Sequence, residues 1–235
     1  KYVADMVVGR YNAGHLIEAA LAHSKYYGTD DLMEPILKYV DLLHKTFGPG
    51  LEQRHGYPGH PEIELALLRL FERTRDPRHL HLARYFIEER GNPTGQGGRH
   101  YFDVEADERG ESPHDRLLYW PAERSYQYYQ AHAPIVDQPT IEGHSVRAMY
   151  LLTAVADLVR LEGPKDNKPK RDALERLWSN MVDKKMYLTG GIGAQKQWEG
   201  FGIDYFLPSG SDEGGCYAET CAGIGVMMLA ERLLQ

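Results

Sequence analysis

Apolar side chains recur every three or four positions along most of the chain, which is the spacing of amphipathic helices. In DPRHLHLARYFIEERG, Asp76 fits the N-cap, Pro77 the first helical position and Gly91 the left-handed stop after the helix. HPEIELALLRLFERT repeats this pattern, with Glu62 and Glu64 in a first turn where the helix dipole favours negative charge. Further helices are predicted at about 14–27, 30–47, 141–162, 169–184 and 217–235.

The predicted helices form pairs in which the first is rich in alanine and leucine and the second carries more charge. This contrast indicates a buried inner helix followed by a more exposed outer helix. Each inner helix opens with a Gly-His dipeptide, and the three histidines are His15, His60 and His144. Hairpins repeated at irregular spacing predict an all-α fold, a closed toroid in which the starts of the inner helices gather at one rim. We expect the histidines to line one cavity there, together with Glu219 and Cys221.

Residues 92–139 interrupt the helical pattern. GGRHYFDVEADERGESP has strand-like aromatic residues between glycines and prolines, and the stretch after it is dense in aromatic side chains. We interpret 92–139 as a long irregular, β-containing insertion over the rim, and loops of this length are often functional. Aromatic side chains there either stack on sugar faces or pack the core of the insertion. They are Tyr119, Trp120, Tyr126, Tyr128 and Tyr129.

Each Gly-His histidine has a plain structural alternative, because a neutral imidazole ring can cap a helix or satisfy its hydrogen bonds at a crowded turn. Three histidines at equivalent positions of a repeat favour a shared function instead. Helix starts also present unpaired N–H groups that can hold sugar hydroxyls or carboxylates.

Two sites in the C-terminal part of the chain carry candidate chemistry: the pair Glu219 and Cys221, and Glu199. Glu219 and Cys221 lie two apart, so both can bind one metal only where a helix begins and the backbone is irregular. Mixed thiolate, imidazole and carboxylate ligands suit zinc, which takes about four; the alternative is a buried structural thiol. Glu199 lies beside Trp198 and Phe201, where a carboxyl group tends to have a raised pKa and can act as an acid. The alternative is a surface glutamate near two core rings.

Composition narrows the function classes. With 235 residues and 42% hydrophobic content, the chain can bury one sizeable core, so 1–235 is expected to be a single domain, cut at both ends. The net charge of −7 and the scattered Lys and Arg residues argue against a nucleic-acid partner. No apolar run is long enough for a membrane helix, so no membrane partner is expected. No leader sequence indicates a targeting signal. Cys216 and Cys221 are too close for a disulfide framework, which favours a metal or a reducing compartment such as the cytoplasm. Compartment and oligomeric state stay open.

The blocks YNAGHLIEAALA, GHPEIELALLRL, YYQAHAPIVDQPTIEGHSVRAMYL, YLTGGIGA, EGFGIDYFLP and YAETCAGIG occur in this order from about residue 11 to 225. Together they resemble glycoside hydrolase family 127, the β-L-arabinofuranosidase family. The resemblance implies an (α/α)6 barrel and a glycosidase that acts on an oligosaccharide or glycoside with retention, through a zinc-bound cysteine thiolate in place of the usual second carboxylate. It leaves the exact sugar and linkage open.

Carried over by position, the resemblance implies that Glu199 is the general acid/base and that Glu219 and Cys221 are two zinc ligands. It also implies that His15, His60 and His144 contact the sugar. The nucleophilic cysteine and a neighbouring cysteine ligand of the family lie beyond ETC, where this chain has ended, and Cys216 is not assigned to either role. The chain by itself is therefore expected not to turn over substrate.

Two rival functions remain open. One is an (α/α)6 epimerase or lyase that uses paired histidines and needs no metal. The other is a non-catalytic carbohydrate-binding or scaffold protein descended from the enzyme. Zinc content separates the first rival from the glycosidase, and the intact set of histidines and glutamates argues against the second.

Overall fold

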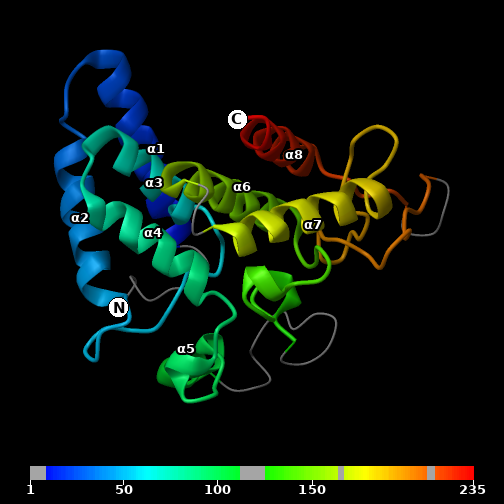
Figure 1. Ribbon diagram of the computed structural model, residues 1–235, viewed down its shortest axis with the longest axis horizontal. Coiled ribbons are helices and arrows are strands. Elements are labelled where there is room, and N and C mark those ends of the chain that lie inside the picture. The colour runs from blue at the N-terminus through cyan, green and yellow to red at the C-terminus, as the bar shows by residue number, and fades with distance from the viewer. Residues whose placement is uncertain (1–8, 112–124, 164–166, 211–214) are drawn as a thin grey trace. The chain divides into compact units, whose positions relative to one another are not determined.

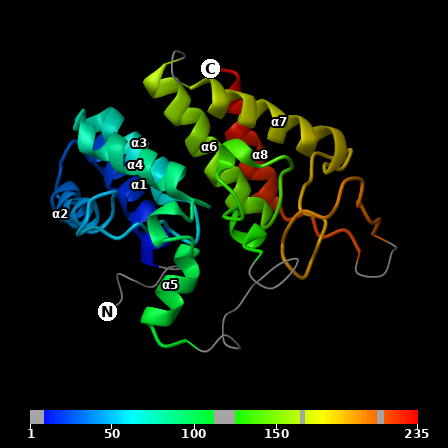
Figure 2. The same ribbon diagram turned by 60° about the horizontal axis from the view of Figure 1, so that its bottom comes forward.

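The structure is a computed structural model that describes residues 9–111, 125–163, 167–210 and 215–235. Within those ranges it is helical, and only isolated β-bridges join extended segments (Figures 1 and 2). The predicted all-α fold is confirmed. The α-helices are α1 (Gly9–Tyr27), α2 (Met33–Thr46), α3 (Ile63–Thr74), α4 (Pro77–Glu89), α5 (Tyr101–Glu108), α6 (Ser145–Glu162), α7 (Lys168–Lys184) and α8 (Thr220–Leu233). Among the helices described, none is long and apolar enough to span a membrane.

The chain divides into two compact units, Lys1–Arg109 and Gly110–Gln235, and each is described by itself. In the first unit α1 packs against α2 and α3, and α3 packs against α4 (Figure 1). Helix α3 is the most enclosed, because a continuous run from Ile63 to Leu68 is buried. It is therefore an inner helix, as its low charge predicts.

Helix starts in the first unit follow the sequence only in part. Asp76 caps α4 by accepting a hydrogen bond from the N–H of Arg78 at 2.9 Å, as predicted. Helix α1, however, begins at Gly9, so His15 lies inside the helix rather than at its start. His60 precedes α3 by three residues, in the turn before the helix. The Gly-His dipeptides therefore do not mark equivalent helix starts.

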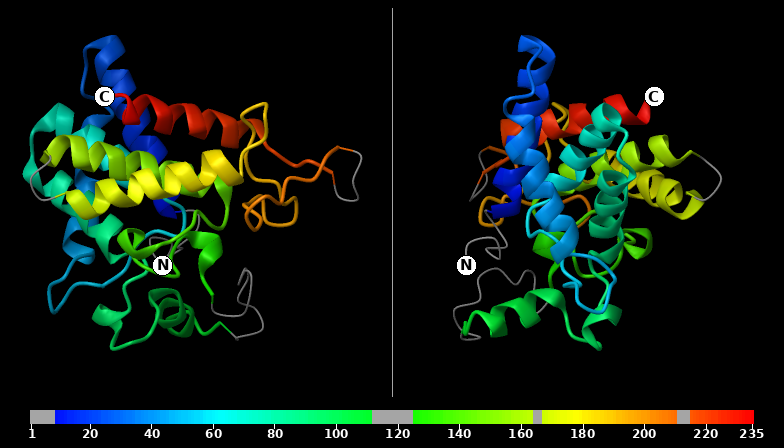
Figure 3. Two further views of the ribbon diagram at one scale, coloured as in Figure 1. Left: turned by 45° about the vertical axis from the view of Figure 1, so that its right-hand side comes forward. Right: turned by 90° about the vertical axis from the view of Figure 1, so that its left-hand side faces the viewer.

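In the second unit α6 packs against both α7 and α8, which lie along it in the left view of Figure 3. Helix α6 is buried along most of its length, in keeping with the predicted inner position. A Cβ at Gly225 would lie 2.6 Å from Cβ of Met149, so glycine lets α8 approach α6 closely. This contact fixes the helix whose first turn carries Cys221.

The strand expected in GGRHYFDVEADERGESP is wrong, because Tyr101–Glu108 forms helix α5. His100 caps this helix by accepting from the N–H of Phe102 at 3.2 Å, and Asp103 lies in the first turn. A cap and a favourable charge outweigh the strand propensity of two adjacent aromatic residues. Other described parts of 92–139 contain short 3-10 turns and irregular backbone, as expected of an insertion.

Candidate active site

His144 and Glu199 meet at the start of α6. His144 is the N-cap of this helix, and its Nδ1 accepts a hydrogen bond from the N–H of Arg147 at 3.4 Å. Its Nε2 lies 3.0 Å from Oε2 of Glu199. Because Nδ1 accepts, the hydrogen of the neutral ring is on Nε2, which donates to Glu199. One ring thus caps α6 through Nδ1 and contacts the predicted acid/base through Nε2.

Burial keeps the His144 ring neutral. Loss of solvent lowers the pKa of His144, Arg147 acts in the same direction, and Glu199 opposes both. His144 is 7% exposed, and its ring packs edge-on against Tyr128, with ring centroids 5.6 Å apart. A neutral, fixed imidazole can orient a carboxyl group without adding a positive charge to the site.

The backbone of Glu199 is anchored to the same helix. Its carbonyl oxygen accepts from the N–H of Ser145 at 3.0 Å and from Oγ of Ser145 at 2.8 Å. Glu199 itself has φ 51°, a left-handed conformation that costs free energy in a residue other than glycine. Strain held by specific hydrogen bonds is typical of a functional position.

Gly143 explains why glycine precedes His144. It has φ +78°, and a Cβ there would lie 2.0 Å from the carbonyl oxygen of Gln127. Its own carbonyl oxygen accepts from the N–H of Phe201 at 2.9 Å, which ties the EGFG segment to the cap of α6. Any larger residue would separate the histidine from the segment that carries Glu199.

Tyr217 joins Glu199 to the predicted metal ligands, and the sequence did not reveal it. Its hydroxyl lies 3.2 Å from Oε1 of Glu199 and 2.7 Å from Oε1 of Glu219. Donation to Glu219, with the negative charge of both carboxylates nearby, raises the pKa of Tyr217, so the hydroxyl stays protonated. Proximity to the ETC block is the only pattern that singles this tyrosine out.

Glu219 and Cys221 lie at the start of α8, where both can face one ligand. Glu219 is the N-cap with φ −58° and ψ 144°, and Cys221 is in the first turn. Sγ of Cys221 donates to Oε2 of Glu219 at 3.2 Å. The irregular backbone at the cap thus removes the objection that residues two apart on a helix diverge.

This pair fits half of a zinc site. A carboxylate and a thiol 3.2 Å apart can share one cation, and both are ligand types that zinc accepts. Burial and Glu219 raise the pKa of Cys221, so the thiol keeps its proton without a cation to replace it. Within the described ranges, no cluster of three or more histidine, cysteine, aspartate or glutamate side chains could hold a metal. Cys216 is exposed and forms no disulfide with Cys221.

In the first unit, Tyr11 brings His15 and His60 together. The Tyr11 ring centroid lies 4.5 Å from that of His15 and 4.3 Å from that of His60. Nδ1 of His60 donates to the carbonyl oxygen of Pro61 at 3.1 Å, whereas Nδ1 of His15 lies 3.2 Å from Oε1 of Glu62. The two histidines therefore form one cluster, although they do not start equivalent helices.

The aromatic residues of the insertion that the structure describes serve packing. Tyr126, Tyr128 and Tyr129 are each buried, and the guanidinium of Arg147 stacks on the rings of Tyr128 and Tyr129. Tyr119 and Trp120 of the predicted aromatic group lie outside the described residues.

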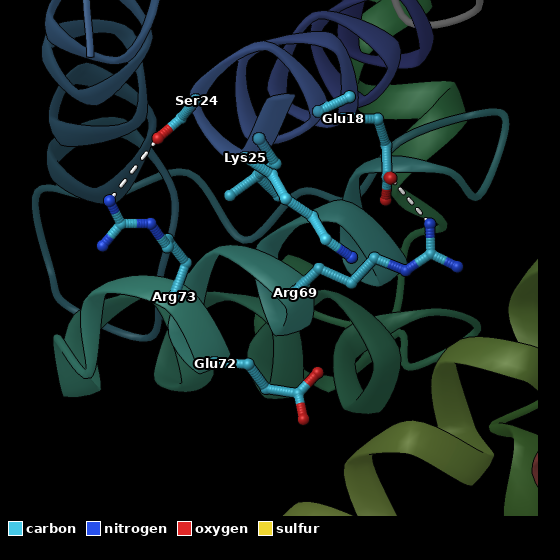
Figure 4. Close-up of a pocket in the computed structure, with 8 residues that line it drawn as sticks. Glu18, Ser24, Lys25, Arg69, Glu72 and Arg73 are labelled. Atoms are coloured by element: carbon cyan, nitrogen blue, oxygen red, sulfur yellow. Dashed lines mark hydrogen bonds and ion pairs between the residues drawn. The ribbon is translucent and has the colours of Figure 1, made fainter. Parts of the chain in front are cut away.

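A groove of about 590 Å³ lies between α1 and α3 (Figure 4), lined by charged residues that include Glu18, Lys25, Arg69 and Arg73. Two of its cations are paired: Arg69 binds Glu18 at 2.6 Å, and Arg73 lies 3.6 Å from Asp30. None of the predicted site residues lines this groove, so the groove is not part of the candidate active site.

Comparison with known proteins decides the family. The family model described as beta-L-arabinofuranosidase, GH127 catalytic domain, matches residues 3–235. The chain belongs to glycoside hydrolase family 127. A non-reducing end β-L-arabinofuranosidase of Bifidobacterium longum subsp. longum is 39% identical over 225 residues, which cover 95% of this chain and 32% of that protein. The chain thus spans about a third of the length of the relatives it matches.

Solved GH127 structures share its fold. A GH127 β-L-arabinofuranosidase from Geobacillus stearothermophilus T6 matches with a TM-score of 0.85 and 39% identity, over 96% of this chain and 33% of that one. A second GH127 β-arabinofuranosidase matches with a TM-score of 0.77 and 34% identity, over 96% of this chain and 30% of that one. The resemblance drawn from the sequence blocks is confirmed.

Proposed function

We propose that the full-length protein carrying this chain is a retaining glycosidase that releases β-L-arabinofuranose, with Glu199 as general acid/base. Family membership supports the glycosidase class, and the named activity of the relatives supports the sugar. The observation that carries the proposal is the Glu199 carboxyl group, held on one oxygen by His144 and on the other by Tyr217. An acid/base needs this kind of fixed orientation toward the leaving oxygen.

The hydroxyl of Tyr217 suits both protonation states of Glu199. A hydroxyl group has one hydrogen and two lone pairs. When Tyr217 donates to Glu219, at the shorter distance of 2.7 Å, its oxygen can accept from a protonated Glu199. Glu199 gives up this proton to the leaving oxygen in the first step, and in the second step its carboxylate takes a proton from water.

We propose that Glu219 and Cys221 supply two ligands of a zinc ion and that further ligands come from outside these residues. Zinc bound there would lower the pKa of the thiol and fix the position of its sulfur. The nucleophile is proposed to be a cysteine outside residues 1–235, and His15, His60 and His144 to contact the sugar. Retention then follows from two successive displacements at the anomeric carbon.

The test is the variant Glu199→Gln in the full-length protein, assayed on methyl and 4-nitrophenyl β-L-arabinofuranosides. Loss of the acid should lower kcat by roughly 10²- to 10⁴-fold on the methyl glycoside, whose leaving group needs protonation. On the aryl glycoside, whose leaving group departs without protonation, the rate of the first step should fall much less. Glu175→Gln on the exposed surface of α7 is the control. Equal turnover of the methyl glycoside by Glu199→Gln and wild type would contradict the role of Glu199.

A further inference from the structure

Glu62 is a buried carboxyl group that contacts a proposed sugar-binding histidine. It precedes α3 in the chain, and its side chain is 2% exposed. Oε1 lies 3.2 Å from Nδ1 of His15, in the middle of α1. Burying a carboxyl group costs free energy, so its presence between two packed helices calls for a reason.

Gly14 makes the contact possible. A Cβ at this position would lie 2.4 Å from Cγ of Glu62 and 2.9 Å from the backbone nitrogen of Ile63. Helix α1 therefore presents a glycine at the point where Glu62 reaches across to His15. The Gly-His dipeptide of the first hairpin thus has a packing role of its own, which differs from that of Gly143.

A purely structural role explains Glu62 poorly. Its side chain makes no capping hydrogen bond to α3, and within the described residues its Oε2 is buried without a hydrogen-bond partner. Glu64 is the contrast, because its carboxylate binds Arg90 at 3.2 Å and accepts from the N–H of Glu62 at 3.2 Å. Glu64 stabilises the fold, whereas the side-chain contact of Glu62 is directed at His15.

Burial and the neighbouring carboxylates favour the protonated form of Glu62. Burial, with Glu18 and Glu64 acting in the same direction and Arg69 opposing, raises the pKa of Glu62 to about 8. Glu18 approaches from α1 and is itself paired with Arg69 (Figure 4). Near neutral pH the carboxyl group of Glu62 therefore keeps its proton and can donate it to Nδ1 of His15, 3.2 Å away.

The position of this proton determines the opposite nitrogen of His15. If Glu62 is protonated, it donates to Nδ1, and the hydrogen of the neutral ring is on Nε2. Nε2 is then a donor, and it points away from the carboxyl group.

We propose that Glu62 is a positioning residue that fixes the His15 ring and keeps a hydrogen on its Nε2, so that His15 donates to a sugar hydroxyl. The catalytic part of this inference rests on the proposed function. The contact and the tautomer do not, because they belong to the free protein. Glu62 touches no substrate and acts only through His15.

The test compares Glu62→Met with Glu62→Gln in the full-length protein. Methionine fills similar space without a buried carboxyl group, so the thermal midpoint should stay equal or rise. The value of kcat/KM on methyl β-L-arabinofuranoside should fall about tenfold, as for one lost hydrogen bond. Glutamine keeps a hydrogen-bonding group, so kcat/KM should fall less in Glu62→Gln than in Glu62→Met. In the double variant, adding Glu62→Met to His15→Ala should lower kcat/KM no further than His15→Ala does. Glu175→Met on exposed α7 serves as control.

A measurement without substrate separates this inference from the proposed function. Proteins labelled with ¹⁵N-histidine report the tautomer of each ring, and the His15 signals are those lost in His15→Ala. The wild type should show hydrogen on Nε2 near pH 7, and Glu62→Met should shift the ring to a mixture of tautomers. An unchanged spectrum in Glu62→Met, or additive losses in the double variant, would overturn the proposal even if the glycosidase activity is present.

Discussion

Tyr217→Phe tests how Glu199 and Glu219 are held together, because it removes the one oxygen atom that contacts both carboxyl groups. That oxygen lies 3.2 Å from Glu199 and 2.7 Å from Glu219. A hydrogen bond to a charged group contributes about 1.5–3 kcal/mol, which corresponds to a factor of roughly 10–150 in rate. The Glu199 side chain is 44% exposed, so water can replace part of the lost interaction. We therefore expect kcat on methyl β-L-arabinofuranoside to fall about 10- to 30-fold, at the lower end of that range.

The assay is initial-rate kinetics on the full-length protein, with circular dichroism to check the fold. Tyr205→Phe is the matched control, because Tyr205 is 71% exposed and changes by the same single atom. Its kcat should equal that of the wild type. A kcat in Tyr217→Phe within twofold of the wild-type value would refute the reasoning that Tyr217 orients Glu199.

Two further predictions concern the scaffold. Arg90→Ala leaves Glu64 buried without its ion-pair partner and removes the hydrogen bond to the carbonyl oxygen of Pro58. The free energy of unfolding of the first unit should fall by about 3–5 kcal/mol, measured as a lower urea midpoint. An unchanged midpoint would count against a stabilising role of the ion pair. Gly143→Ala should displace His144 through a clash with Gln127 and lower kcat at least about tenfold. Gly163→Ala is the control, because Gly163 has a similar φ but open space around its Cβ, and kcat should stay unchanged. Equal losses of kcat in both variants would assign the effect to backbone strain alone.

Helix periodicity was sufficient to predict the fold class. The apolar repeats gave the helices and their inner or outer character, because burial of one face determines both. The Asp76 cap was also predictable, because it is a local hydrogen bond between residues two apart in the chain. The α5 segment was misjudged because its cap, His100, is not a common N-cap residue and the aromatic pair after it favours strands.

The candidate site was predictable where chemistry and sequence position coincide. Glu219 and Cys221 are only two positions apart in the chain, so a helix start suffices to bring them together. Contacts between distant segments were not predictable: Tyr217 reaches Glu199, and Glu62 reaches His15, only through backbone paths and helix packing that no local pattern records. Glu62 was interpreted as an acidic residue favoured by the helix dipole, and its contact with α1 adds a role that depends on Gly14.

The central claim is that Glu199 works beside a metal site that begins with Glu219 and Cys221. Its most direct test is the zinc content of the full-length protein and of Cys221→Ser, by elemental analysis after exhaustive dialysis, with Cys216→Ser as the matched control. The account predicts about one zinc per chain in the wild type and the control, and loss or marked weakening of binding in Cys221→Ser. Absence of zinc from the wild type, or full zinc in Cys221→Ser, would contradict it.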